Sequence, residues 1–127
     1  MFNERKREAA VADFMAAAGV TTYEDRPEKI GMVLSCLMEE VTELLDAVTD
    51  YRTKPSPETR ASLCKEWADA QYVLSQLAVY FSIPADASFN RVHESNMSKV
   101  VDGKIRSRED GKVLKPEGYK PPDMTGL

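Results

Sequence analysis

Two pairs of acidic side chains repeat one spacing in the sequence. Glu40 and Glu43 lie in the run LMEEVTELLDAV, and Glu66 and Asp69 lie in the run CKEWADAQYVL. Residues three apart share one face of a helix, so each helix would present two carboxylates side by side. Carboxylates so placed repel each other, and a hard divalent cation such as Mg²⁺, which prefers oxygen ligands, would relieve that repulsion.

Glu66 is the most informative of these four acids. At about 100° per residue around a helix, Glu66 falls inside an apolar arc and Asp69 falls at its edge. The arc consists of Leu63, Ala70, Val73, Leu74, Leu77 and Phe81. The preceding helix has a similar apolar arc, and Glu40 lies on its border. That arc consists of Leu34, Leu37, Met38, Val41, Leu44, Leu45 and Val48. A partly buried carboxylate needs a cation or a proton, and antiparallel packing of the two arcs would bring both acidic pairs to one rim.

Acidic pairs at this spacing also occur on helices that bind no magnesium. A solvated helix face carries such pairs commonly, and salt bridges from Arg91 or Lys99 would also satisfy them. A di-iron bundle needs Glu-x-x-His pairs, but Asn90 stands three residues before the only histidine, His93. A zinc site lacks Cys and His ligands, and the sequence contains no P-loop, no GxGxxG and no convincing nucleophile–base pair. A magnesium site and a solvated or salt-bridged face therefore both stay open.

Four helical stretches would position these residues. The apolar periodicity predicts helices over about 3–18, 28–52, 56–82 and 86–100. Gly19 is the expected stop of the first helix, and Pro27 suits the first turn of the second. The third helix would start near Ser56, and Asp86 or Ser88 would cap the fourth.

The length and the patterning predict one all-α domain over residues 1–127, a four-helix-type bundle. The helical body would span about 3–100, and a basic tail would span about 101–127. Asp110-Gly111 is a turn signal between two short apolar runs, so the tail is expected to be irregular or a small hairpin.

Composition excludes several classes of protein. The net charge is −4, which argues against a nucleic-acid binder, and no apolar run is long enough to span a membrane. Residues 1–90 hold 9 basic and 15 acidic side chains, whereas residues 91–127 hold 8 basic and 6 acidic ones. The first residues contain no secretory signal, and Cys36 and Cys64 have no framework spacing. A cytoplasmic protein with free thiols is expected.

The order of motifs resembles a known enzyme superfamily. GluGlu-x-x-Glu at 39–43 and Glu-x-x-Asp at 66–69 lie on successive helices, followed by the tail HESNMSKVVDGKIRSREDGKVLKPEGYKPPD. This combination resembles the all-α nucleoside triphosphate pyrophosphohydrolases, the MazG-like superfamily that includes phosphoribosyl-ATP pyrophosphatase and the dimeric dUTPases. Enzymes of this superfamily use Mg²⁺ and a water molecule to cleave a nucleoside triphosphate between the α- and β-phosphates. The products are the monophosphate and pyrophosphate.

The resemblance also implies roles for individual residues. The metal ligands would be Glu40, Glu43, Glu66 and Asp69. Glu39 would orient or deprotonate the attacking water, and Mn²⁺ is an expected substitute for Mg²⁺. The residues expected to contact the substrate phosphates are Asn96, Lys99, Lys104 and Arg106.

Members of the superfamily assemble as dimers or dimers of dimers, so a homo-oligomer is expected, with no nucleic-acid or membrane partner. Two alternative functions stay open. One is the phosphoribosyl-ATP pyrophosphatase reaction in the same cleft. The other is a helical dimerisation or adaptor module without enzymatic activity, whose acidic rim would bind a basic partner.

Overall fold

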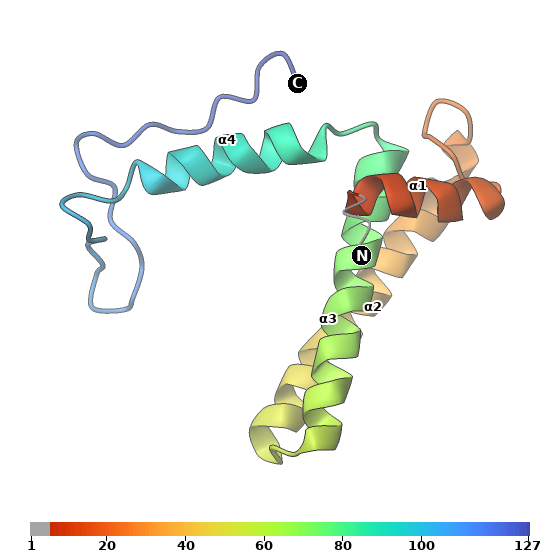
Figure 1. Cartoon of the computed structure of the whole chain (residues 1–127), viewed down its shortest axis with the longest axis horizontal. Coiled ribbons are helices and arrows are strands. Elements are labelled where there is room, and N and C mark those ends of the chain that lie inside the picture. The colour runs from red at the N-terminus through yellow and green to blue at the C-terminus, as the bar shows by residue number, and fades with distance from the viewer. Residues whose placement is uncertain (1–5) are drawn as a thin grey trace, which may run out of the picture. The chain divides into compact units, whose positions relative to one another are not determined.

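The computed structural model describes residues 6–127, and these residues form an all-α structure, as predicted (Figure 1). The helices are α1 (Arg7–Ala17), α2 (Ile30–Thr53), α3 (Pro57–Tyr80) and α4 (Ala85–Met97), and a 3₁₀ turn, η1 (Pro27–Lys29), precedes α2. The chain divides into two compact units, Met1–Ile83 and Pro84–Leu127. Helix α4 therefore belongs to the same unit as the tail. Residues 3–5 of the first predicted helix lie outside the described residues. None of the helices in residues 6–127 combines the length and apolar content that a membrane span requires.

A glycine ends α1, as predicted. Gly19 has a φ of +73°, a left-handed conformation that glycine adopts at little cost. The Val20 N–H donates to the Met15 carbonyl at 2.9 Å, and the Gly19 N–H donates to the Ala16 carbonyl at 3.1 Å. These two bonds form a Schellman motif, and its usual apolar contact is present because Met15 and Val20 are both buried.

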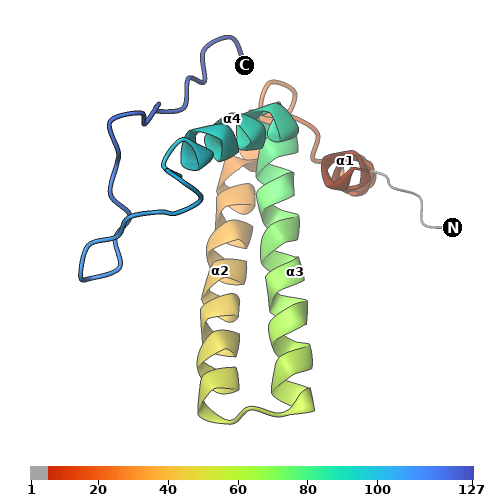
Figure 2. The same cartoon turned by 60° about the vertical axis from the view of Figure 1, so that its left-hand side comes forward.

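Helices α2 and α3 form an antiparallel hairpin (Figure 2). Ser56 caps α3, because its Oγ accepts the Thr59 N–H at 3.0 Å while Thr59 Oγ1 accepts the Ser56 N–H at 2.9 Å. Pro57 occupies the first helical turn, where a missing N–H costs nothing. This reciprocal cap fixes the start of α3, at the position that the sequence predicted, and so fixes its register against α2.

The buried core of the first unit joins α1, the 20–29 connection, α2 and α3. Its members are Val11, Met15, Val20, Val33 and Tyr80, with Leu77 and Val79 packed against them. Tyr80 is fully buried, and its hydroxyl donates to the Arg26 carbonyl at 2.6 Å. The Tyr23 N–H in turn donates to the Tyr80 carbonyl at 2.7 Å. These two bonds hold the connection against the end of α3.

The apolar arc predicted along α2 is only partly covered within the chain. Met38 and Leu45 are 72% and 61% exposed, and Trp67 of α3 is 53% exposed, whereas Val33 and Ala47 are buried. Packing of α2 against α3 therefore leaves part of the arc exposed within one chain. The physical reason is that a helix meets a single neighbour through a strip narrower than a wide apolar arc.

In the second unit, α4 starts earlier than predicted. Its N-cap residue is Pro84, which makes no side-chain cap, so the prediction of Asp86 or Ser88 as the cap is wrong. The Ser88 N–H already donates to the Pro84 carbonyl at 2.9 Å, which places Ser88 inside the first turn. Asp86 lies in that turn as well, where a negative charge interacts favourably with the helix dipole.

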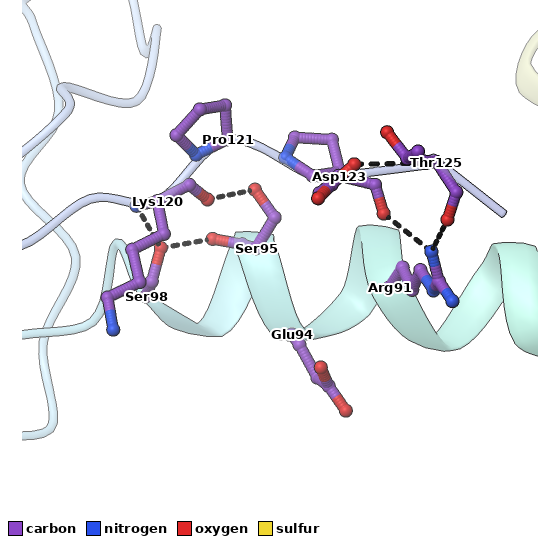
Figure 3. Close-up of a pocket in the computed structure, with 9 residues that line it drawn as sticks. Arg91, Glu94, Ser95, Ser98, Lys120, Pro121, Asp123 and Thr125 are labelled. Atoms are coloured by element: carbon purple, nitrogen blue, oxygen red, sulfur yellow. Dashed lines mark hydrogen bonds between the residues drawn. The ribbon is translucent and has the colours of Figure 1, made fainter.

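The end of the tail lies along α4 (Figure 3). Arg91 Nη1 donates to the carbonyls of Asp123 and Thr125 at 3.0 and 2.7 Å. Ser95 Oγ donates to the Lys120 carbonyl at 2.7 Å. Because each of these three acceptors is a main-chain carbonyl, the attachment depends on the backbone of the tail rather than on its side chains.

The predicted hairpin in the tail is present as a pair of bridged segments rather than as strands. Ser107 and Val113 form an antiparallel bridge, and the Arg108 N–H donates to the Lys112 carbonyl at 2.8 Å. Asp110 Oδ1 accepts the Lys112 N–H at 3.0 Å, which closes the turn around the Asp110-Gly111 pair that the sequence singled out.

Candidate metal centre

Three of the four predicted metal ligands converge between α2 and α3. Glu40 and Glu43 come from α2 and Glu66 comes from α3, and each offers a carboxylate oxygen within 4.8 Å of the other two. The three-residue spacing places the first two on adjacent turns of one helix, and the antiparallel hairpin brings the third beside them. These three residues are called the carboxylate trio below.

Two oxygens of the carboxylate trio are buried without a partner. Glu40 Oε2 and Glu66 Oε2 have no hydrogen-bond partner among the described residues. The side chain of Glu66 is 15% exposed, in agreement with its predicted place in an apolar arc. A buried charged oxygen without a partner is costly, so each of these oxygens is suited to binding a cation.

The charges of the trio act on one another. The pKa of Glu43 is raised, chiefly by the negative charge of Glu40 and then by burial, with further contributions from Glu66. A raised carboxyl pKa means that the folded chain resists the third negative charge. A cation within the trio would reverse that effect, because an opposite charge favours the ionised carboxylate.

Asp69, the fourth predicted ligand, does not join the trio. Its Oδ2 lies 2.9 Å from Lys65 Nζ, and the same ammonium lies 3.2 Å from Glu66 Oε1. Hydrogen bonds to Asp69 and then to Glu66 raise the pKa of Lys65. Lys65 therefore neutralises the edge of the acidic site on α3.

Sequence reasoning missed Lys65 and named Arg91 and Lys99 instead. Within the second unit, Arg91 donates to tail carbonyls and Lys99 Nζ donates to Asn96 Oδ1 at 3.0 Å. Salt bridges from these two cations to the acidic pairs stay a prediction. The available signal was the four-residue spacing from Lys65 to Asp69, which puts the two side chains on adjacent turns of one helix.

Glu39 precedes Glu40 on α2 and is exposed, outside the carboxylate trio. Its predicted role with the attacking water stays a prediction. Residues adjacent in sequence point about 100° apart around a helix, so the Glu39 side chain leaves the helix in a different direction from that of Glu40.

The predicted phosphate-binding residues all belong to the second unit. Asn96 and Lys99 lie near the end of α4 and contact each other through the hydrogen bond given above. Lys99, Lys104 and Arg106 line one pocket of about 430 Å³. The structure thus brings three of the four predicted residues to one concave surface.

The arrangement of the trio has a defined chemical capacity. Among the described residues the cluster consists of three glutamates, an oxygen-only donor set, which suits Mg²⁺ or another hard divalent cation better than zinc. The pairing of the two helices makes this set without any loop residue, so its geometry rests on rigid elements.

Comparison with known proteins places these features in one family. A search among curated proteins found no match. The family model of phosphoribosyl-ATP pyrophosphohydrolase matches residues 8–96, which is more than half of the chain and includes the carboxylate trio. This match indicates a pyrophosphohydrolase that acts on a nucleotide-like substrate. The chain belongs to the phosphoribosyl-ATP pyrophosphohydrolase family, within the MazG-like superfamily that its acidic motifs resemble.

Proposed function

We propose that the protein hydrolyses a nucleoside triphosphate to the monophosphate and pyrophosphate in a Mg²⁺-dependent reaction, by attack of water between the α- and β-phosphates. The observation that carries this proposal is the pair of buried oxygens without partners, Glu40 Oε2 and Glu66 Oε2, beside Glu43. In a chain of a pyrophosphohydrolase family, such an oxygen donor set fits a metal that binds phosphate.

The carboxylate trio would hold the cation, and Asp69 would join it by giving up its contact with Lys65. When bound, Mg²⁺ supplies positive charge next to phosphate oxygens and makes an attacking water more acidic. Phosphoryl transfer needs mainly positioning and neutralisation of charge, so a covalent nucleophile is not required. Glu39 would accept the proton of the water, and Asn96, Lys99, Lys104 and Arg106 would position the phosphates.

Phosphoribosyl-ATP is the second candidate substrate. The specific observation in its favour is the name of the matched family. Both reactions break the same kind of anhydride bond and need the same metal, so a substrate panel distinguishes them. Canonical and modified nucleoside triphosphates and phosphoribosyl-ATP are incubated with the protein and Mg²⁺, or with Mn²⁺ as a substitute. Failure to release pyrophosphate from any of them at high enzyme concentration would refute both candidates.

Ligand assignment is tested by charge-removing substitutions in the trio. Glu43→Gln and Glu66→Gln are each expected to abolish turnover while the helical circular dichroism spectrum is retained. Asp46→Asn is the matched control, because Asp46 is an exposed acid one turn after Glu43 on the same helix and lies outside the trio. Turnover that survives either trio substitution would show that the assignment is wrong.

A homodimer, or a dimer of dimers, is proposed as the assembled form. Its support is the exposed apolar side chains of α2 and α3, including Met38, Leu45 and Trp67, which a second copy would cover. Static light scattering measures the mass of the assembly directly.

A reducing cytoplasm is proposed as the compartment, because it suits the free thiols of Cys36 and Cys64.

The competing function is an adaptor module without enzymatic activity. It predicts that Mg²⁺ leaves the melting temperature unchanged, whereas the enzyme proposal predicts a rise.

A further inference from the structure

A basic pocket lies within the second compact unit, between the end of α4 and the tail. Its volume is about 430 Å³, which falls in the range of small-molecule sites. Its lining includes four cationic side chains, Lys99, Lys104, Arg106 and Lys115, against one acidic side chain, Glu117. The pocket therefore has an excess of positive charge in a chain whose net charge is −4.

Three of these cations have no acidic partner in the described part of the chain. Lys104, Arg106 and Lys115 form no ion pair with a residue that the structure describes. Arg108, in the same tail, is different, because its Nη2 lies 2.7 Å from Asp110 Oδ2. Cations that converge on a concave surface without acidic partners are a usual feature of an anion-binding site.

Backbone hydrogen bonds fix the main chain that carries these cations. Asp102 and Gly103 have φ values of 52° and 72°, and Val101 and Lys104 exchange two hydrogen bonds of 2.8 and 3.0 Å across them. Positive φ at both central residues defines a type I′ turn, for which Asp-Gly is a preferred sequence. The Leu114 N–H donates to the Arg106 carbonyl at 2.8 Å, which ties Arg106 to the segment that carries Lys115.

Tyr119 contacts two of the cations. Lys99 Nζ lies 5.6 Å from the centre of its ring, and Lys115 Nζ lies 5.2 Å from it. Both distances are within the range of cation–π attraction. The ring therefore links a lysine of α4 to a lysine of the tail and limits the positions that both ammonium groups can adopt.

We propose that this pocket binds the phosphate groups of a compact polyphosphate, and that it does so without a divalent cation. Lys115 is assigned as a phosphate-binding residue, and Tyr119 is assigned as a positioning residue for Lys99 and Lys115. The identification of the ligand as a nucleoside triphosphate rests on the proposed function. A pocket of this size favours a small polyphosphate over a nucleic-acid strand, which would need an extended basic surface.

Titration of the full chain with inorganic pyrophosphate, in EDTA and at low ionic strength, tests this assignment by calorimetry. Lys115→Gln is expected to weaken binding about tenfold, because a charge-assisted hydrogen bond is lost. Tyr119→Leu should weaken binding, whereas Tyr119→Phe, which keeps the ring, should bind as wild type does. Lys112→Gln is the matched control, since it removes the same charge from the same tail at a residue that does not line the pocket.

Absence of pyrophosphate binding by the wild-type chain would overturn the proposal. Equal weakening by Lys112→Gln and Lys115→Gln would overturn it too, because the effect would then be general charge. A single-stranded oligonucleotide that competes more tightly than pyrophosphate, and depends on Lys115, would overturn the assignment to a small ligand.

Enzyme kinetics separate this proposal from the proposed function. With an active substrate and Mg²⁺, Lys115→Gln should raise KM more than it lowers kcat. If no substrate is hydrolysed but Lys115→Gln still abolishes pyrophosphate binding, the pocket stands and the proposed function fails. If turnover is present and both KM and pyrophosphate affinity are unchanged in Lys115→Gln, the function stands and the pocket fails.

Discussion

Removal of one charge from the carboxylate trio should stabilise the metal-free protein and abolish its response to Mg²⁺. Glu66→Gln is the most informative substitution, because the side chain is 15% exposed and its Oε2 is buried without a partner. Glutamine has nearly the same volume, and its amide can donate to Glu40 or Glu43. The substitution therefore replaces a repulsive contact by a hydrogen bond.

The magnitude follows from two opposing contributions. A buried polar atom without a hydrogen-bond partner costs about 1–3 kcal/mol, and a charged one costs more. Against this, Glu66→Gln weakens the 3.2 Å contact with Lys65, because an amide oxygen carries no full negative charge. Lys65 keeps its 2.9 Å contact with Asp69. We therefore expect the free energy of unfolding in EDTA to rise by about 1 kcal/mol, which raises the Tm by about 3–5 °C.

Magnesium should invert the order of stability. Binding to the native state alone stabilises the wild type by about 2.7 kcal/mol at a free ion concentration of ~100 Kd. The variant lacks one of the three ligands and should show little of this gain. Melting curves in EDTA and in Mg²⁺ for wild type, Glu66→Gln and the control Asp46→Asn measure both effects. A Glu66→Gln protein that melts below wild type in EDTA, or that gains as much as wild type from Mg²⁺, would refute the reasoning.

The remaining predictions concern pH, a neighbouring cation and the core. Because the pKa of Glu43 is raised above 4.5, its contribution to metal-free stability is present at low pH and is lost as pH rises through the folded-state pKa. Urea midpoints against pH in EDTA should fall more steeply in that window for wild type than for Glu43→Gln, and parallel curves would contradict this. Lys65→Met should enlarge the Mg²⁺-induced rise in Tm, since Asp69 is freed and a competing ammonium is removed; an unchanged or smaller rise would count against it. Tyr80→Phe should lower the Tm by about 3–6 °C, because the Arg26 carbonyl loses a partly buried 2.6 Å hydrogen bond. A melt within one degree or so of wild type would contradict that expectation.

Short-range signals account for the parts of the structure that the sequence predicted well. The stop at Gly19, the start of α3 at Ser56 and Pro57, and the turn at Asp110-Gly111 each depend on a few consecutive residues. Hydrogen bonds that cap a helix or close a turn act within about five residues, so their signals survive in the linear chain. The cap of α4 was mispredicted because Asp86 and Ser88 are both good cap residues, while the backbone begins the helix at Ala85, with Pro84 as the N-cap residue.

The sequence predicted some features of the candidate metal site, and only the folded structure decided the others. Helical spacing alone paired Glu40 with Glu43 and placed Glu66 in an apolar arc, since a helix has a fixed rotation per residue. Only the packing of α2 against α3 decided that these three oxygens converge. That outcome depends on the rotation of one helix against another and on the side-chain torsions, which no local pattern specifies.

The sequence by itself determined the helices, the acidic motif and the basic character of the tail, because periodicity and charge are properties of the linear chain. The tertiary structure decided which charges are neutralised. It left two oxygens of the trio without a partner in the part of the chain that the structure describes, and it gathered Lys115 with Lys104 and Arg106 around one pocket. Neutralisation depends on distances of a few ångströms between residues that turns and helix packing bring together, so it is settled only when the chain is folded.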